Sequence, residues 1–363
     1  MTDSNAQETG PLIDCRSVWK VFGSRSHEAI RAIAERGIGK ADVLKEFGCV
    51  VGVADVSLTL NKGEIFCIMG LSGSGKSTLI RLFNRLIEPS LGQILVRGKN
   101  ISAMGDEQLR QLRARHMGMV FQNVALLPKR TVLDNAAFGL EVQKIGKAQR
   151  HDIARGALAR VGLAEWENHY PHELSGGMQQ RVGLARALAA DPEIILMDEP
   201  FSALDPLIRR QLQDEFRQLS KELGKSAVFI THDLDEAMRI GDRIAIMKDG
   251  AIVQVGTAED IVLKPADDYV EKFVAGISRL HLVRAHSVMV EAGEFRRARP
   301  DLDLKRLPRA EPDAEVDELI RLTLEGRHEA IAVVEQDDIV GVVTPRSLLQ
   351  GVRGKEPGEA VAL

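Results

Sequence analysis

Gly70-Leu-Ser-Gly-Ser-Gly-Lys-Ser-Thr78 is the stretch that decides the fold, because its spaced glycines, its lysine and its hydroxyls form a phosphate-binding pattern. The short apolar run Ile65–Met69 precedes it, and Ser77 to Asn84 continue as a helix. A strand, a glycine loop and a helix in this order place backbone N–H groups and the positive helix end around one anion. The stretch therefore predicts an α/β fold with a phosphate site at a strand end.

Each residue type in the loop has a chemical reason to be there. Gly70, Gly73 and Gly75 let the backbone turn inward, Lys76 adds a charge for the β- and γ-phosphates, and Ser77 offers a hydroxyl to Mg²⁺. The alternative is a glycine-rich turn with one exposed lysine, which the flanking strand and helix disfavour. The predicted phosphate-binding set is Gly70, Ser72, Gly73, Ser74, Gly75, Lys76, Ser77 and Thr78.

Four further runs follow in a fixed order. They are Leu174-Ser-Gly-Gly-Met-Gln-Gln-Arg181, Ile194-Ile-Leu-Met-Asp-Glu-Pro200, Ser202-Ala-Leu-Asp205 and Ile230-Thr-His-Asp233. Asp198 ends an apolar strand, where a carboxylate can hold Mg²⁺ through water, and Glu199 comes one residue later, at the attacking water. A solvated acidic pair at a strand end is the plain alternative. The distance from the P-loop favours the catalytic interpretation.

The composition is that of a globular protein. Of 363 residues, 44% are hydrophobic and 28% are charged, and the net charge of −4 gives no general attraction for nucleic acid. No apolar run approaches the roughly 20 residues that span a bilayer, and the first residues do not have the pattern of a secretory signal, so we expect a cytoplasmic chain. Cys15, Cys49 and Cys67 are expected to be reduced, buried thiols.

The length fits one large domain and one smaller domain. We predict a first domain over 12–275, with a two-helix insert at 24–50 and a helical subdomain at 123–178. A second, α+β domain is predicted over 276–355. Within it, 313–353 has a helix–strand–strand–helix pattern that resembles one CBS repeat, while His281–Val290 is a faint trace of a second.

Taken together, the motifs resemble the ATPase subunit of an ABC transporter. The resemblance implies a P-loop NTPase fold with ATP and Mg²⁺ as ligands. It implies that Glu199 is the general base, that His232 contacts the γ-phosphate and orients the water, and that Gln122, in Val120-Phe-Gln-Asn123, senses Mg²⁺ and water. The implied metal set is Ser77, Gln122 and Asp198.

Ser175, Gly176 and Gly177 suit a second anion site at a helix start, although the chain already has one phosphate loop. In the ABC family the second loop faces the nucleotide of the opposite subunit, so the resemblance implies a homodimer that sandwiches two ATP molecules. Asp205 then lies at the seam between the two sites.

Adenine needs an aromatic face, and aromatic residues make up only 4% of the chain. The family usually places this residue after the first strand. Phe22, before Gly23, is at the matching position, and Phe47-Gly48 repeats the local pattern after the insert. Phe22 is the preferred candidate, and for either ring a packing role is the alternative.

Narrower features are similar to the glycine betaine/proline importer ATPases, which transport quaternary amines and other compatible solutes. These features are the insert, Arg81-Leu-Phe-Asn-Arg-Leu-Ile-Glu-Pro89, Ser202-Ala-Leu-Asp-Pro-Leu-Ile208, Thr231-His-Asp-Leu-Asp-Glu-Ala237 and the CBS-like tail. The similarity implies a pair of these subunits at the cytoplasmic face of the inner membrane, beneath membrane permeases that an extracytoplasmic binding protein supplies. The segment 123–135 is expected to receive a permease helix.

Two other functions stay open. One is an ABC importer ATPase for another amino acid such as histidine, and the other is a soluble ABC ATPase outside transport. Regulation through the CBS-like tail, or dimerisation by it, is a further expectation.

Overall fold

The computed structural model describes residues 10–122, 124–202, 204–275, 282–326 and 328–353. The chain divides into two compact units, Met1–Thr257 and Ala258–Leu363. Asn123 and Ala203, which belong to two of the predicted motifs, and the predicted domain start at 276 lie outside the described residues.

An antiparallel sheet opens the first unit, with strand order β2-β1-β4-β5. Ile13 pairs with Leu60 on one side and with Val96 on the other. Alternate residues of β2 are buried, as expected for a strand with one face on the core. The strands are β1 (Ile13–Phe22), β2 (Val50–Leu60), β4 (Leu91–Val96) and β5 (Lys99–Asn100).

The second sheet has the order β10-β9-β3-β8-β7-β6 and is parallel except for β10. Every residue of β3, β7 and β8 is buried, which explains their continuous apolar sequence. The parallel strands point their carboxyl ends to one edge, so the loops after β3, β6, β7 and β8 meet there. The strands are β3 (Ile65–Met69), β6 (Met117–Val120), β7 (Ile194–Asp198), β8 (Ser226–Thr231), β9 (Arg243–Lys248) and β10 (Ala251–Gly256).

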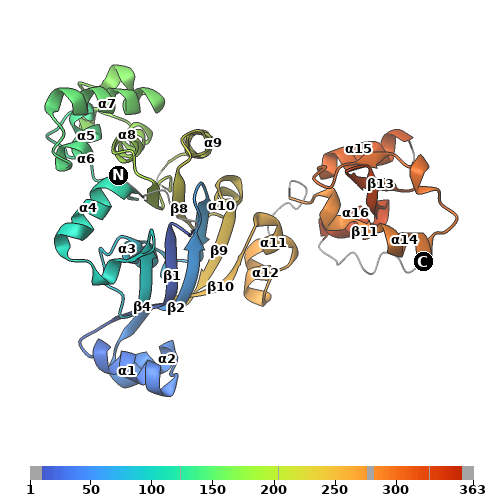
Figure 1. The fold of residues 1–363 in the computed structure, drawn as a ribbon, viewed down its shortest axis with the longest axis horizontal. Helices are drawn as coiled ribbons and strands as arrows, with labels where there is room; N and C mark the ends of the chain where they lie inside the picture. Colours follow the sequence, from blue (N-terminus) through green and yellow to red (C-terminus); the bar gives the residue numbers. More distant parts are fainter. Residues whose placement is uncertain (1–9, 123, 203, 276–281, 327, 354–363) are drawn as a thin grey trace, which may run out of the picture. The chain divides into compact units, whose positions relative to one another are not determined.

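One hydrophobic core joins the two sheets. Phe66 and Ile68 of β3 and Leu79 and Phe83 of α3 are fully buried in it, together with residues of β1 and β2. The helices around the sheets are α3 (Lys76–Phe83), α4 (Asp106–His116), α9 (Pro206–Glu222) and α10 (Leu234–Ile240). Figure 1 shows α3 and α4 beside the antiparallel sheet and α9 and α10 beside β8 and β9.

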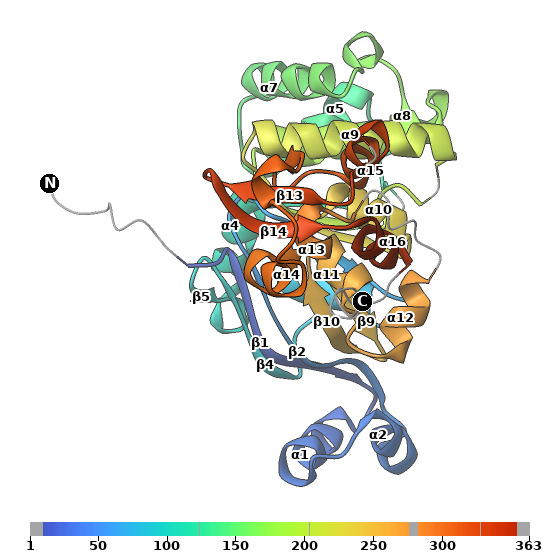
Figure 2. The same cartoon turned by 90° about the vertical axis from the view of Figure 1, so that its right-hand side faces the viewer.

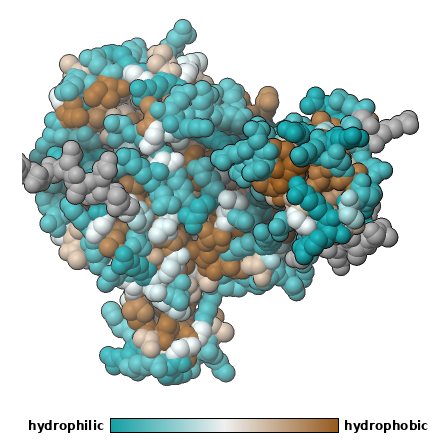
Figure 3. Space-filling view, turned by 45° about the vertical axis from the view of Figure 1, so that its right-hand side comes forward, coloured by the Kyte–Doolittle hydropathy of each residue, from teal (hydrophilic) through white to brown (hydrophobic). Residues whose placement is uncertain are grey.

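The predicted insert consists of α1 (Ser26–Arg36) and α2 (Lys40–Phe47), which end at the left-handed glycines Gly37 and Gly48. Its small core packs Ala29, Ile33 and Val43 against β1 and β2. Both views show the insert projecting from the end of these strands (Figures 1 and 2). Apolar surface is visible on this lobe at the bottom of Figure 3, where Leu44 is an exposed residue.

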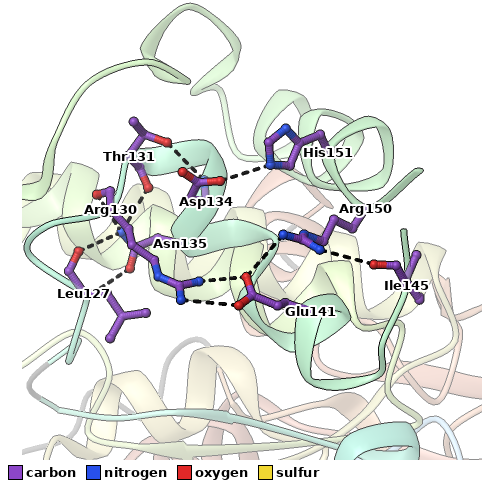
Figure 4. Close-up of polar contacts among 9 residues, drawn as sticks. All are labelled: Leu127, Arg130, Thr131, Asp134, Asn135, Glu141, Ile145, Arg150 and His151. Carbon is purple, nitrogen blue, oxygen red and sulfur yellow. Dashed lines mark hydrogen bonds and ion pairs between the residues drawn. The ribbon is translucent and has the colours of Figure 1, made fainter. Parts of the chain in front are cut away.

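A separate helical region follows β6. It contains α5 (Val132–Ala136), α6 (Phe138–Val142), α7 (Lys147–Arg160) and the long α8 (Gly176–Ala189). A polar network ties its first loop to α5, with Asn135 at the centre and the ion pair of Arg130 with Glu141 beside it (Figure 4). Short 3₁₀ turns lie at Ile101–Ala103, Ala164–Trp166, Pro171–Glu173 and, in the second unit, Leu304–Arg306.

The second unit contains a sheet of order β11-β14-β13-β12 with its own core. The helix, two strands and helix predicted over 313–353 are all present, and Gln336 and Asp337 form the tight turn with positive φ. The CBS-like assignment itself stays a prediction. The elements are α11 (Ala258–Leu263), α12 (Asp268–Val274), α13 (Ala285–Val288), β11 (Val290–Glu291), α14 (Ala292–Ala298), β12 (Arg309–Ala310), α15 (Val316–Gly326), β13 (Ile331–Glu335), β14 (Asp338–Val343) and α16 (Pro345–Arg353).

The division between the units lies earlier than the predicted end of the first domain at 275. The sheet of the first unit ends with β10, and Leu263 of α11 packs against the core of the second unit. Apolar packing therefore joins α11 to the second unit, and α12 follows it within the same compact unit. Within the described ranges, no helix combines the length and the apolar character that crossing a bilayer requires.

Candidate functional site

The loop after β3 can be built only with glycine at two positions. Gly70 has φ +152° and Gly75 has φ +103°. A Cβ at Gly70 would lie 2.2 Å from the Met247 carbonyl oxygen, and one at Gly75 would lie 2.2 Å from the Gly52 carbonyl oxygen. The backbone therefore approaches its neighbours closely here, and α3 begins directly after the loop.

Lys76 lies across the loop that it follows. It is only 5% exposed, and its Nζ donates to the carbonyl oxygens of Gly70 (2.8 Å) and Leu71 (3.1 Å). Burial lowers the pKa of the Lys76 ammonium, whereas the carboxylates of Glu199 and Asp198 act in the opposite direction. The lysine is thus a buried cation at the place where phosphate oxygens are expected.

The loop fits an anion in a second way. The Ser74 hydroxyl is buried and has no hydrogen-bond partner within the part of the chain that the structure describes. Gly73 faces open space. An unpaired hydroxyl inside a glycine loop, beside a buried ammonium, is suited to phosphate oxygens.

Ser77 and Asp198 form the candidate metal pair. The Ser77 Oγ donates to Asp198 Oδ1 at 2.8 Å, and Arg81 Nη2 lies 3.6 Å from Asp198 Oδ2. The Asp198 carboxylate is buried at the carboxyl end of β7. A hydroxyl and a carboxylate are the hard oxygen ligands that Mg²⁺ prefers, so the pair fits this ion.

Glu199, His232 and Gln122 converge from the ends of three strands. Glu199 Oε2 lies 3.2 Å from His232 Nδ1 and 3.5 Å from Gln122 Nε2. Glu199 has φ +47°, a conformation that costs a non-glycine residue about 1 kcal/mol or more and that occurs preferentially at functional sites. The Gln122 amide also lies 3.4 Å from the Ser202 Oγ, and among the described residues it makes no hydrogen bond with Ser77 or Asp198, the other two members of the implied metal set.

One cavity of about 740 Å³ is lined by Lys76, Ser77, Gln122, Glu199 and His232. Phe22 also belongs to its wall. Phe22 is 40% exposed, and Lys20 Nζ lies 5.2 Å from its ring centroid. Gly52 makes room for the ring, because a Cβ there would lie 2.8 Å from Phe22 Cε2. Phe47 instead packs in the insert, with the Arg25 guanidinium 5.1 Å from its ring, so the geometry favours Phe22 for adenine.

Sequence reasoning missed several residues of this wall. They are Lys40, Val50, Val51, Gly52 and Leu71. A lysine as the first residue of α2 was a usable signal, because a cation is unfavourable at the positive end of a helix. The others gave no signal, since apolar strand residues are common.

The second predicted anion loop lies outside this cavity. Ser175 is the N-cap of α8, where its Oγ accepts from the Met178 N–H at 3.3 Å. Asp205 is the N-cap of α9 and accepts from the N–H groups of Leu207 and Ile208. Ser175, Gly176, Gly177 and Asp205 are absent from the cavity wall. Their roles at a nucleotide therefore require a second chain and stay predictions.

Helix α8 also holds the backbone after Gln122. Gln180 Nε2 lies 3.4 Å from the Gln122 carbonyl oxygen, and Arg186 donates to the carbonyl oxygens of Val124 (2.7 Å) and Ala125 (2.9 Å). A Cβ at Gly183 would lie 2.5 Å from Val124 Cγ1. Hydrogen bonds and close packing thus connect α8, the helix capped by Ser175, to the loop that carries Gln122.

Comparison with known proteins gives a consistent result. A family model described as ABC transporter matches residues 53–202. The glycine betaine/carnitine transport ATP-binding protein GbuA of Listeria monocytogenes is 49% identical over 300 residues, which cover 82% of this chain and 75% of that protein. The trimethylamine N-oxide transport system ATP-binding protein TmoW of Ruegeria pomeroyi is 45% identical over 93% of this chain and 96% of that protein. A dimeric bacterial ABC transporter cassette aligns with a TM-score of 0.58 and 32% identity, over 68% of this chain and 98% of that one.

Proposed function

Since the chain belongs to the ABC transporter family, among its transport ATP-binding proteins, we propose that it hydrolyses ATP to drive uptake of a quaternary amine such as glycine betaine or choline. The observation that carries the catalytic part is the convergence of Lys76, Ser77, Asp198, Glu199 and His232 in or beside one cavity. GbuA, named for glycine betaine and carnitine, supplies the argument for a quaternary amine, whereas TmoW is named for trimethylamine N-oxide, an amine oxide with the same trimethylated nitrogen.

The residues divide the chemistry among them. Lys76 and the loop hold the β- and γ-phosphates, and Phe22 stacks on adenine. Ser77 and Asp198 would hold Mg²⁺, which neutralises charge on the phosphate oxygens. Glu199 accepts the proton of the attacking water, while His232 and Gln122 keep the Glu199 carboxylate and that water in position.

A complete site requires two copies of the chain. Ser175, Gly176 and Gly177 lie outside the cavity of their own chain, and α8 begins at this loop with an exposed start. In a head-to-tail homodimer, this loop of one subunit would close on the phosphates held by the other, with Asp205 at the seam. The similar cassette is described as dimeric, which supports the pairing of two chains.

The permease would dock beside the loop that follows Gln122. A groove of about 730 Å³ lies between α4, α6 and α8, with Met119 and Phe138 in its wall and the 56% exposed Val142 at α6. Arg113, Arg115 and Lys144 add positive charge, whereas Arg110 forms an ion pair with Glu107 of the same wall (2.7 Å). Such a groove fits an amphipathic helix that carries acidic residues. Arg186 lines the groove and also binds the backbone at 124–125, so docking and Gln122 are physically linked.

This arrangement places the chain at the cytoplasmic face of the inner membrane. The solute would be selected by the permease and an extracytoplasmic binding protein. A histidine importer and a soluble ABC ATPase are the competing functions, and the relatives' names favour quaternary-amine uptake over both. The second unit would regulate or dimerise the complex.

The deciding experiment is purification of the tagged full chain from membranes with its native partners. We expect a multi-span permease to co-purify, and reconstituted vesicles with the binding protein to accumulate glycine betaine only with MgATP. An ATPase that purifies without a membrane protein would refute the transport role. Accumulation of histidine but no quaternary amine would refute the solute class.

A further inference from the structure

The α1–α2 insert contributes a cation to the nucleotide cavity. Lys40, the first residue of α2, lines the same cavity as Phe22, Lys76 and Glu199. Its Nζ lies 3.3 Å from Asp249 Oδ1, in the turn between β9 and β10. We propose that Lys40 binds the phosphate chain of the nucleotide and that the insert is therefore part of the ATP site. This inference rests on the proposed function.

The position of Lys40 is unfavourable for the helix itself. A positive side chain in the first turn adds to the positive end of the helix dipole, where acidic residues are preferred. Asp42 supplies one acidic group in the same turn, but the Gly39 N-cap supplies no side-chain hydrogen bond. A residue that breaks a local rule and lines a cavity is a candidate for function rather than for stability.

The packing of the insert fixes the backbone from which the Lys40 side chain extends. Val43 of α2 is fully buried in the core shared with Val21 and Val51. Arg36 donates to both carboxylate oxygens of Glu46, at 2.8 and 2.9 Å. The helix is thus fixed on the strands that also carry Phe22, while the four-carbon stem of Lys40 gives the ammonium freedom to move within the cavity.

The pair of Lys40 with Asp249 is weak enough to exchange. Its side chains are 39% and 73% exposed, and ion pairs between exposed groups contribute little. The phosphate chain carries several negative charges, and the cavity wall already contains the Glu199 carboxylate, so a second cation besides Lys76 is favourable there. An ammonium acts as a point charge, which suits phosphate oxygens better than the adenine ring.

The test compares three charge-neutralising substitutions in a Glu199→Gln background, which separates binding from hydrolysis. Calorimetric titration with MgATP should show about twofold to fivefold weaker binding for Lys40→Gln, the size expected for one partly exposed charge contact. Asp249→Asn should bind MgATP as tightly as the parent or more tightly, because it frees the lysine. Lys45→Gln, an exposed position on the same helix and outside the cavity wall, should leave affinity unchanged.

Weaker MgATP binding by Lys40→Gln, without weaker binding by Asp249→Asn, distinguishes ligand binding by the lysine from a structural role of the Lys40–Asp249 pair. Equal weakening by both variants, or unchanged affinity in Lys40→Gln, would overturn the proposal. In the chain that keeps Glu199, Lys40→Gln should raise the KM for ATP and leave kcat within about twofold. The difference in KM from the wild-type chain should shrink at high salt. Failure of the wild-type chain to bind MgATP would instead refute the proposed function, so the two failures are distinguishable.

Discussion

Asn135→Ala should destabilise the helical region strongly, because one buried amide holds the loop before α5. Asn135 is 0% exposed. Its Oδ1 accepts from the Leu127 N–H at 2.7 Å, and its Nδ2 faces the carbonyl oxygens of Leu127 (3.1 Å), Arg130 (3.1 Å) and Thr131 (3.0 Å) (Figure 4). The amide therefore replaces the hydrogen bonds that this irregular backbone cannot make with itself.

The magnitude follows from the hydrogen bonds. The NH₂ group has two hydrogens, so at most two of the three carbonyl contacts form fully at one time. With the bond from Leu127, the side chain makes about three hydrogen bonds of about 1 kcal/mol each. The expected loss is thus about 3 kcal/mol, and with an m-value of about 2 kcal/mol/M the urea midpoint should fall by about 1.5 M.

Tryptophan fluorescence can follow this region alone. The chain has two tryptophans, and the Trp166 ring contacts the His169 ring at a tilted angle of 47°. The His169 carbonyl oxygen accepts from the Val132 N–H of α5. In a Trp19→Phe background, Trp166 reports the unfolding of the helical region. Thr131→Ala is the matched control, because it removes a single cap bond, Asp134 N–H to Thr131 Oγ1 at 3.2 Å, for about 1 kcal/mol.

If Asn135→Ala lowers the urea midpoint no more than Thr131→Ala does, the Asn135 amide does not hold this loop. An unchanged m-value is also required, since a changed slope would mean that the unfolding unit differs. Asn135→Asp provides a second check, because a carboxylate would face carbonyl oxygens and lose the donor. It should destabilise at least as much as Asn135→Ala.

Three further outcomes are expected. Glu199→Gln should bind MgATP and lose about 10²–10⁴-fold in turnover, the usual share of a general base; phosphate release near the wild-type rate would remove Glu199 from that role. A mixture of Lys76→Ala and Ser175→Arg subunits should hydrolyse ATP faster than either parent, because each mixed dimer keeps one intact composite site; no gain in ATPase activity on mixing would count against the shared site. Arg186→Ala should lower kcat more than it raises KM, since the backbone after Gln122 loses two hydrogen bonds while the phosphate loop is intact; the exposed Arg160→Ala is the control, and equal effects of the two substitutions would contradict the linkage.

Much of the fold follows from local sequence patterns. The fully apolar runs before Gly70 and ending at Asp198 are buried parallel strands, as continuous apolar sequence predicts. The helices of the insert end at Gly37 and Gly48, both of which have positive φ. These features depend on residues that are neighbours along the chain. They were therefore predictable, as was the order of the motifs that supply the site.

Contacts between distant residues were decided only by the tertiary structure. Lys40 and Asp249 are 209 positions apart, and neither belongs to a motif. Three further features likewise depend on how completed elements pack: the presence of Phe22 rather than Phe47 in the cavity wall, the groove beside Arg186, and the packing of α11 on the second unit. Periodicity and turn chemistry are set by adjacent residues, whereas a cavity wall depends on close packing of side chains from several elements, and no local pattern encodes it.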